Sequence, residues 1–287
     1  MPSPVPSSTA DDGASAPKPE KTETAGSLAR FLLSIALIAW AMRSLFIQPF
    51  SIPSGSMLPA LFIGDYIAVS KWPYGYSRYS FPWSFPPING RIFAGLPKRG
   101  DVVVFHLPSE NADLVKRVIG LPGDTVEVRG GALILNGRIV PRRPLSPVAM
   151  PISPNSPCRV IPPAQPDVVE RGGHPYCLYP ALLESLPGGP SYTVLDQVDA
   201  SAGDNFGPAK VPAGRLFLMG DNRDDSLDSR FPTDEGGVDM LPLEDVIGRA
   251  QLTFWSTDGS ASYVKPWTWF TALRARRIGN GYTGPAR

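Results

Sequence analysis

The chain has 287 residues, with 27 basic and 26 acidic side chains and a net charge of +1. Because nucleic-acid binding needs a clustered basic field, this balance excludes nucleic acid as an expected partner. The 34 prolines and 28 glycines are many for a helical protein and favour short strands joined by turns. We therefore predict a mostly β fold with antiparallel sheet.

The chain begins with a polar tail that precedes a long apolar run. Residues 1–26 are rich in Pro, Ser, Ala and Thr and have almost no large apolar side chains, which predicts a disordered tail. The charge-free run Phe31–Met42 is shorter than the roughly 20 residues that a membrane-spanning helix needs, but its continuation to Phe50 supplies that length. We predict one transmembrane anchor helix over residues 27–48. Lysines and arginines before the run predict a cytoplasmic tail, with the body beyond the membrane.

The apolar run also allows a second interpretation, the core of a cleaved signal peptide. Ala39-Trp40-Ala41 resembles a cleavage site. The long polar segment before the run and the apolar residues after the triplet favour an uncleaved anchor.

A loop rich in serine and proline follows the anchor. Pro49–Asp65 holds Ser51, Ser54 and Ser56 among prolines and glycines, which keep the backbone in turns or extended conformations. A serine in such a constrained loop is a candidate nucleophile, but its hydroxyl needs a nearby base.

Strand patterns occur along most of the remaining chain. Apolar or alternating runs predict strands, and Asn136-Gly137 predicts a hairpin with a type I′ turn. The predicted segments are Asp65–Trp72, Asp101–His106, Leu114–Gly120, the hairpin Leu133–Val140, Ser191–Leu195, Arg215–Met219 and Val246–Phe254.

These patterns divide the body into a core, a cap and a tail. We assign residues 49–140 and 213–266 to a candidate catalytic core, an antiparallel sheet or partial barrel. Residues 141–212 are rich in proline and glycine and show only short strand candidates, so we interpret them as an inserted cap. Residues 267–287 form the predicted C-terminal tail.

Two aromatic segments each allow two interpretations. Pro73–Pro97 is rich in Pro, Tyr, Phe and Trp and forms either a local core or a surface that touches lipid. In the tail, Trp267, Trp269 and Phe270 precede several arginines. This tail either docks on the body or lies on an anionic membrane surface.

The cysteines and histidines are too few to support a metal site. Cys158 and Cys177 are a candidate disulfide if the body lies outside the cytoplasm, and two free buried thiols are the alternative. With no Cys-x-x-Cys and only His106 and His174, a structural zinc site is poorly supported. We expect neither a metal nor another cofactor.

The acidic turn Gly220–Arg230 does not fit a calcium loop. Arg223 stands where an oxygen ligand is needed, and Ser226 replaces the sixth-position glycine. The simpler interpretation is a turn whose polar side chains bond their own backbone while Arg223 and Arg230 pair with its aspartates.

A lysine is the better candidate for the base that the serine needs. His106 ends an apolar strand and His174 lies in the predicted cap, so a Ser-His-Asp triad has little support. Lys116 interrupts the apolar strand Leu114–Gly120, where burial would lower its pKa and leave a neutral amine. The ordinary interpretation is a lysine exposed on an edge strand.

Five segments then combine into a resemblance that covers Phe31 to about Ala250. In order, they resemble the successive sequence boxes of bacterial type I signal peptidases, also called leader peptidases. The segments are Ile52–Pro59, Gly64–Lys71, Arg99–Phe105, Lys116–Asp124 and Gly220–Arg230.

The resemblance implies a Ser-Lys dyad. Ser56 matches the nucleophile and Lys116 the general base. Ser54 matches the hydroxyl that helps the Ser56 N–H to hold the oxyanion, and Ser226 matches the hydroxyl that orients the lysine amine. Residues expected to support the site are Asp221, Asn222, Arg223, Asp228 and Arg117, the last as a partner of one aspartate.

The resemblance also implies the activity and its place in the cell. It implies a membrane-bound serine endopeptidase that removes signal peptides from exported preproteins after a small-x-small motif. The expected partners are preproteins and the lipid bilayer. The enzyme is expected in the bacterial inner membrane as a single-pass protein, with its catalytic domain on the periplasmic face. Departures from the family pattern are Ala60, Asp225 and the segment Phe231–Met240, and none removes a dyad residue.

Two other functions remain open from the sequence. A Ser-Lys self-cleaving, repressor-like protease would carry an N-terminal DNA-binding domain, where this chain has a polar tail and an apolar run. A catalytically dead, membrane-tethered binding module would not need Ser56 and Lys116.

Overall fold

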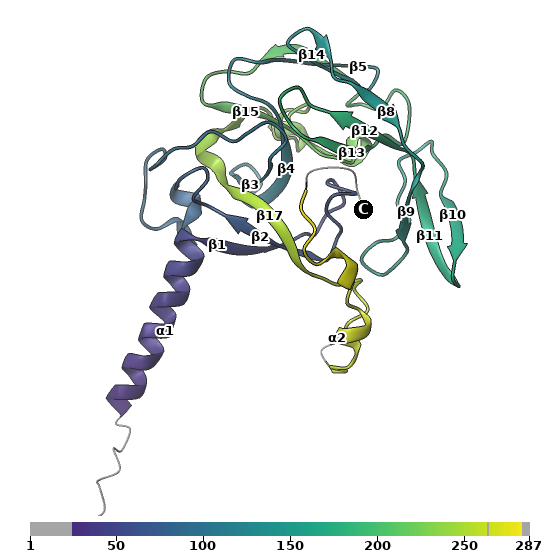
Figure 1. The fold of residues 1–287 in the computed structure, drawn as a ribbon. Helices are drawn as coiled ribbons and strands as arrows, with labels where there is room; N and C mark the ends of the chain where they lie inside the picture. The colour runs from purple at the N-terminus through teal and green to yellow at the C-terminus, as the bar shows by residue number, and fades with distance from the viewer. Residues whose placement is uncertain (1–24, 263, 283–287) are drawn as a thin grey trace, which may run out of the picture. The chain divides into compact units, whose positions relative to one another are not determined.

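A computed structural model describes residues 25–262 and 264–282 of the chain (Figure 1). The first helix, α1, runs from Ala25 to Leu45, and within the described residues it is the one helix long and apolar enough to cross a membrane. Its 21 residues extend over about 31 Å, close to the thickness of the hydrocarbon core of a bilayer. Most of the tail expected at residues 1–26 lies outside the described residues, and Ala25 and Gly26 belong to α1.

The helix ends earlier than the sequence analysis placed it. It stops at Leu45, and Ile47–Ser51 forms strand β1, which pairs with β2. Pro49 disfavours helical conformation at Gln48, and the pairing of Ile47–Ser51 with β2 places these residues in the sheet. The helix reaches its spanning length by beginning at Ala25.

The largest sheet confirms the predicted mostly β, antiparallel fold. Its seven strands follow the order β1-β2-β17-β3-β4-β15-β16, and neighbouring strands pair antiparallel. Five predicted strands recur here with ends shifted by a few residues at most. The remaining bounds are β2 Asp65–Ser70, β3 Val102–Leu107, β4 Ala112–Gly120, β15 Arg215–Met219, β16 Leu241–Pro242 and β17 Val246–Ser256.

A second sheet contains the predicted hairpin. Its order is β14-β5-β6-β7, and the turn between β6 and β7 is Asn136-Gly137. Both turn residues have positive φ, 52° and 74°, as a type I′ turn requires, so this prediction is confirmed. The strands are β5 Thr125–Arg129, β6 Ala132–Leu135, β7 Arg138–Ile139 and β14 Asn205–Lys210.

Residues 141–212 contain more strands than the sequence indicated. Two three-stranded sheets form, in the orders β10-β11-β9 and β13-β12-β8. The remaining strand of this segment, β14, belongs to the sheet that contains the hairpin. Prolines lie in several of these short strands, which obscures their alternation in the sequence. Cys158 and Cys177 form a disulfide here. The strands are β8 Arg142–Pro144, β9 Val148–Pro151, β10 Asp167–Arg171, β11 His174–Tyr179, β12 Ala181–Ser185 and β13 Ser191–Leu195.

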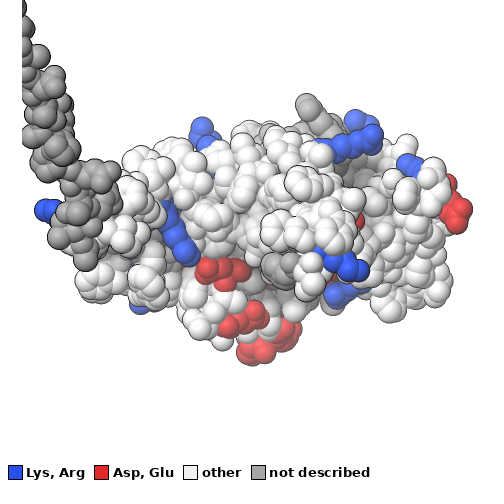
Figure 2. Space-filling view, turned by 90° about the horizontal axis from the view of Figure 1, so that it is seen from below, with Lys and Arg blue, Asp and Glu red and all other residues white. Residues whose placement is uncertain are grey.

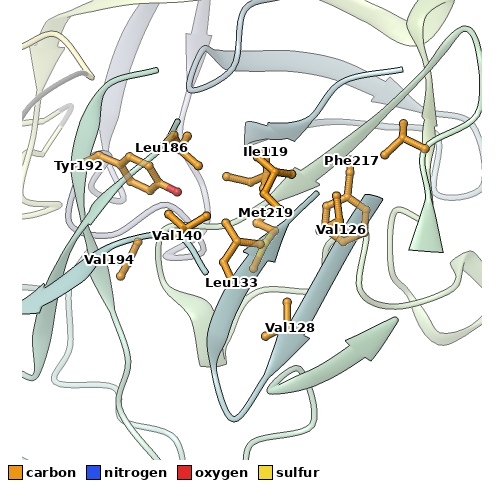
Figure 3. Close-up of a cluster of buried hydrophobic side chains, with 12 residues drawn as sticks. Ile119, Val126, Val128, Leu133, Val140, Leu186, Tyr192, Val194, Phe217 and Met219 are labelled. Atoms are coloured by element: carbon orange, nitrogen blue, oxygen red, sulfur yellow. The ribbon is translucent and has the colours of Figure 1, made fainter. Parts of the chain in front are cut away.

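One apolar cluster joins the large sheet, the second sheet and the 141–212 segment. Ile119 of β4 and Phe217 of β15 pack with side chains of β5 and β6, and Tyr192 and Val194 of β13 close the cluster (Figure 3). Each of these four residues is almost fully buried. Such packing fixes β4, which carries Lys116, against the second sheet and against the 141–212 segment.

The two aromatic segments are only partly buried. In the first segment Tyr74 is buried and its hydroxyl donates to Asp101 (2.7 Å), whereas Trp83 and Phe93 are 91% and 84% exposed. At the other end of the chain, Trp267 is exposed but the residues from Arg274 to Tyr282 contact the body. The short helices are α2 Thr268–Thr271, η1 Arg78–Ser80, η2 Pro82–Ser84, η3 Arg223–Asp225, η4 Thr233–Glu235, η5 Leu243–Asp245 and η6 Ala275–Arg277.

Candidate active site

The loop between β1 and β2 carries Ser56 and is closed at its base. The Ile52 N–H donates to the Asp65 carbonyl, and the Gly64 N–H donates to the Ile52 carbonyl, both at 2.9 Å. The side chain of Met57 is fully buried beside Ser56. Closure at the base and an apolar anchor next to the serine hold the backbone of Ser56 in place.

Lys116 reaches this serine from β4. In the antiparallel register of β3 and β4, Lys116 lies opposite Val103. The Lys116 Nζ lies 2.7 Å from the Ser56 Oγ, within hydrogen-bond distance. Lys116 is 4% exposed and Ser56 is 8% exposed. The structure therefore brings together the predicted nucleophile and the predicted base, which lie 60 residues apart in the sequence.

Burial changes the protonation of Lys116. Loss of water around the ammonium lowers the pKa of Lys116 to about 8, and Arg230 contributes in the same direction. Asp228, Asp221 and Asp225 favour the ammonium and oppose this shift. An amine with this pKa is neutral in about a tenth of the molecules at pH 7, far more than an ordinary lysine, and only the neutral amine can act as a general base.

The acidic turn after β15 packs directly against the nucleophile loop. Asp228 accepts hydrogen bonds from the Ser226 hydroxyl and the Gly220 N–H, both at 2.9 Å. A Cβ on Gly220 would lie 2.3 Å from the Ser226 Oγ and 2.5 Å from the Ser56 carbonyl oxygen, so only glycine fits there. The Ser226 hydroxyl donates to Asp228 and makes no hydrogen bond to Lys116.

Asn222 and Ser54 lie on the backbone side of Ser56. The Asn222 N–H donates to the Ser56 carbonyl (3.0 Å), and its side-chain amide donates to the Gly55 carbonyl (3.1 Å). Ser54 is exposed and makes no hydrogen bond with any residue that the structure describes. Its hydroxyl is therefore free to turn toward a bound substrate.

The two arginines predicted near the site pair differently from one another. Arg117 makes two hydrogen bonds to Asp221, of 2.7 and 2.6 Å, as expected for a partner of an aspartate. Arg223 pairs with Glu184 of β12, at 2.5 Å, so the expectation that it pairs with an aspartate of its own turn is wrong. Glu184 is the lone charge in the apolar strand Ala181–Ser185 and is almost fully buried. That isolated charge was the available sequence signal for a buried partner.

The histidines and cysteines lie elsewhere. His106 pairs with Asp113 (2.9 Å) and stacks on Tyr79, and His174 is exposed on β11. Neither histidine bonds Ser56, so the structure gives a Ser-His-Asp triad no support. Cys158 and Cys177 are joined 19 residues apart, with their Cα atoms separated by 5.3 Å.

One group of carboxylates could hold a cation. Among the described residues, Asp196, Asp204 and Asp224 each place one oxygen within 4.8 Å of the others. Arg142 pairs with Asp196, and the Ser201 hydroxyl donates to Asp204. The Gln197 and Val198 N–H groups donate to Asp224 (2.6 and 3.1 Å), and these bonds tie the 141–212 segment to the acidic turn.

Two C-terminal arginines, which no sequence pattern linked to the site, contact the nucleophile loop. Arg277 pairs with Asp65 (2.6 Å), donates to the Ala60 carbonyl (2.9 Å), and lies over the ring of Phe62. Arg274 donates to the Ile63 carbonyl (2.9 Å). Both arginines therefore hold the part of the nucleophile loop between Ala60 and Asp65.

The chain is similar to proteins of one family along most of its length. The family model described as signal peptidase, peptidase S26, matches residues 25–255. Signal peptidase I of Rickettsia felis is 33% identical over 86% of this chain and 88% of that protein, and the Rickettsia typhi protein is 31% identical over 86% and 89%. A crystal structure of a signal peptidase I from Enterococcus faecalis is 22% identical and covers 53% of this chain and 95% of that one, with a TM-score of 0.27.

The Arg277 contact predicts a large loss of stability on substitution. Arg277→Gln leaves the fully buried Asp65 carboxylate without its guanidinium, and we expect the free energy of unfolding to fall by about 3 kcal/mol. Denaturant unfolding of the purified protein measures this loss. Arg276→Gln, an exposed neighbour, is the matched control and should change stability little. Equal stability of the two variants would contradict the role of Arg277.

Proposed function

Because this chain belongs to the signal peptidase family, peptidase S26, we propose that it is a serine endopeptidase that removes N-terminal signal peptides from exported preproteins. The observation that carries the proposal is the 2.7 Å contact between the Lys116 Nζ and the Ser56 Oγ, with both groups buried. A buried amine beside a buried hydroxyl is the arrangement that activates a serine without a histidine.

In the first chemical step Ser56 forms the acyl-enzyme. The neutral amine of Lys116 takes the Ser56 proton as the Oγ attacks the scissile carbonyl carbon. When the tetrahedral intermediate collapses, the carbon–nitrogen bond breaks and the Lys116 ammonium returns a proton to the leaving amine. The mature protein then leaves with a new N-terminus.

In the second step water releases the signal peptide. Lys116 is neutral again and takes a proton from a water that attacks the ester carbonyl. Collapse of this second intermediate breaks the bond to the Ser56 Oγ, which recovers its proton from Lys116. The signal peptide leaves with a free carboxylate, and the dyad returns to its starting state.

The oxyanion of both intermediates needs donors close to Ser56. The Ser56 N–H makes no hydrogen bond with any described residue, and Ser54 has a free hydroxyl. We assign both as oxyanion donors, since groups placed where charge develops stabilise the transition state. The proposed substrate motif, small-x-small before the cleaved bond, follows from the family.

The helix α1 supports a place in the bacterial inner membrane. We propose a single pass with the N-terminus in the cytoplasm and the catalytic domain on the periplasmic face, because Lys18, Lys21 and Arg30 precede the apolar run. Sharing a bilayer with the preprotein raises the effective concentration of substrate. Exposed Trp83 and Phe93 suit contact with the lipid interface.

Nucleic acid is not a proposed partner. Basic side chains on the face shown in Figure 2 are scattered, and its acidic side chains gather mainly on one lobe. Together with the net charge of +1, this leaves no clustered basic field on that face.

Substitution of the dyad tests the function directly. The purified full-length enzyme in detergent should cleave a peptide after Ala-x-Ala. Ser56→Ala and Lys116→Met should each lower kcat/KM by at least about a thousandfold, because each removes one partner of the proton transfer. Ser51→Ala and Lys210→Met, exposed residues of the same types, are the matched controls. Full activity of either dyad variant, with an unchanged Tm, would exclude the mechanism.

The pKa of Lys116 predicts the pH profile of the reaction. Only the neutral amine is active, so kcat/KM should fall as the pH drops below about 8, the pKa of Lys116. Well below that value the loss should approach tenfold per pH unit. Initial rates across the pH range, with Tm recorded at each pH, measure the midpoint. A rate that stays constant down to about pH 6 would rule out a neutral lysine base.

Ser54 should act on the transition state more than on binding. Ser54→Ala removes one oxyanion donor, and we expect kcat to fall by about a hundredfold while KM changes little. Ser54→Thr retains a hydroxyl and should recover much of this loss. Steady-state kinetics on the same peptide separate the two parameters. A rise in KM with an unchanged kcat would assign Ser54 to substrate binding instead.

A further inference from the structure

Two of the carboxylates that act on Lys116 have a buried arginine each. Asp228 pairs with Arg230 at 2.8 Å, and Asp221 pairs with Arg117 at 2.6 Å. All four of these side chains are almost fully buried. Each guanidinium partly offsets a negative charge that favours the Lys116 ammonium.

A third carboxylate, Asp225, is paired in a different way. Asp225 pairs with Arg159 at 2.9 Å. The Asp225 side chain is 17% exposed, and the Arg159 side chain is 71% exposed. Asp225 also lies beside the nucleophile loop, because its Oδ2 is 3.9 Å from where a Cβ on Gly55 would stand. The pair therefore sits at the rim of the site, next to the residue that precedes Ser56.

Arg159 does not come from the acidic turn or from the large sheet. It follows Cys158, which is bonded to Cys177 of β11. Its backbone N–H donates to the Tyr179 hydroxyl (3.2 Å), which in turn donates to the Arg159 carbonyl (3.1 Å). A disulfide and a buried tyrosine thus fix the backbone at Arg159. This restricts the positions of its exposed side chain.

The same part of the chain packs on the nucleophile loop. Cys177 and Tyr179 belong to an apolar cluster that also contains Phe62 and, at its edge, Leu58 and Cys158. Leu58 lies two residues after Ser56. The segment that delivers Arg159 is therefore in contact with the loop whose chemistry Arg159 would affect.

We propose that Arg159 is a positioning residue of this peptidase, which pairs with Asp225 and so weakens the influence of this third carboxylate on the Lys116 amine. The disulfide between Cys158 and Cys177 holds Arg159 in place. This inference rests on the proposed function, because it assigns Arg159 an effect on the general base. Arg159 acts through Asp225 and does not touch the reacting atoms.

The charges around the two groups set the direction of the effect. The strongest charges acting on Lys116 are Asp228, Arg230, Asp221 and Asp225. The three carboxylates raise the pKa of the lysine, and Arg230 lowers it. Burial raises the pKa of Asp225, and Arg159 and Lys116 lower it. Asp225 also raises the pKa of the Tyr179 hydroxyl. Tyr179 itself is not among the strongest influences on the pKa of Lys116. Removing Arg159 should therefore make the Lys116 amine harder to keep neutral.

The test is the pH profile of kcat/KM for the full-length enzyme with an Ala-x-Ala peptide. Arg159→Gln should raise the midpoint of the acid limb by about 0.5 pH unit, a modest shift because the pair is partly exposed, and lower the rate about threefold at pH 7. Asp225→Asn should lower the midpoint. Adding Arg159→Gln to Asp225→Asn should cause no further shift, because the carboxylate is gone.

Three further variants separate this effect from general damage. Arg159→Lys retains the charge and should keep the midpoint near that of the wild type. Arg142→Gln, which removes the Asp196 pair of the same segment, is the matched control and should leave the midpoint unchanged. The double variant Cys158→Ser, Cys177→Ser frees the segment and should shift the midpoint in the direction of Arg159→Gln.

The outcomes distinguish this inference from the proposed function. A wild-type enzyme that cleaves, with Arg159→Gln retaining its midpoint, overturns the role of Arg159 and leaves the function intact. An equal shift from Arg159→Gln with and without Asp225 also overturns it. An unshifted cysteine variant overturns the part assigned to the disulfide. A wild-type enzyme that cleaves no such peptide overturns the function and the inference together.

Discussion

The burial of the Lys116 amine beside Ser56 is the constraint on which the rest of the site depends. Lowering the pKa from 10.5 to about 8 corresponds to a free-energy cost of about 3 kcal/mol for an ammonium held in this place. The folded state binds the proton less tightly than the unfolded state, so the folded protein carries the full cost below about pH 8 and loses it as the pH rises toward the ordinary lysine value. The apolar packing around β4, between β3 and β15, must supply stability to offset it.

Buried ion pairs organise the groups around that amine. Replacing such pairs by apolar residues is often neutral for stability, so their main effect here is geometric. Three of them join segments far apart in the chain, while Arg230–Asp228 lies within the acidic turn, and the loss of one partner of any pair would leave a charge in the interior. Although the net charge is only +1, several charged side chains are buried in the protein interior. The pairs are Arg117–Asp221, Arg230–Asp228, Arg223–Glu184 and Arg277–Asp65.

The sequence predicted local features well and distant pairings poorly. Alternation and turn residues located most strands of the large sheet and the Asn136-Gly137 hairpin, and a lysine that interrupts an apolar strand drew attention to Lys116. The choice of partners depends on the folded chain, so Glu184 as the partner of Arg223 was not foreseen. Neither was the position of β17 between β2 and β3, because a local pattern carries no information about which strands pair. The roles of Ser56 and Lys116 came from a family resemblance, and their proximity came from the structure.

The C-terminal contacts have a consequence for how the enzyme is made. Arg277 pairs with Asp65 across 212 residues, and the Arg117 guanidinium donates to the carbonyl of Tyr282 across 165 residues. During synthesis the nucleophile loop and β4 leave the ribosome long before these partners exist. A nascent chain that already contains Ser56 and Lys116 therefore still lacks the contacts that brace both. The loop that carries Ser56 and the strand that carries Lys116 are therefore fully braced only after Arg277 and Tyr282 have been added to the chain.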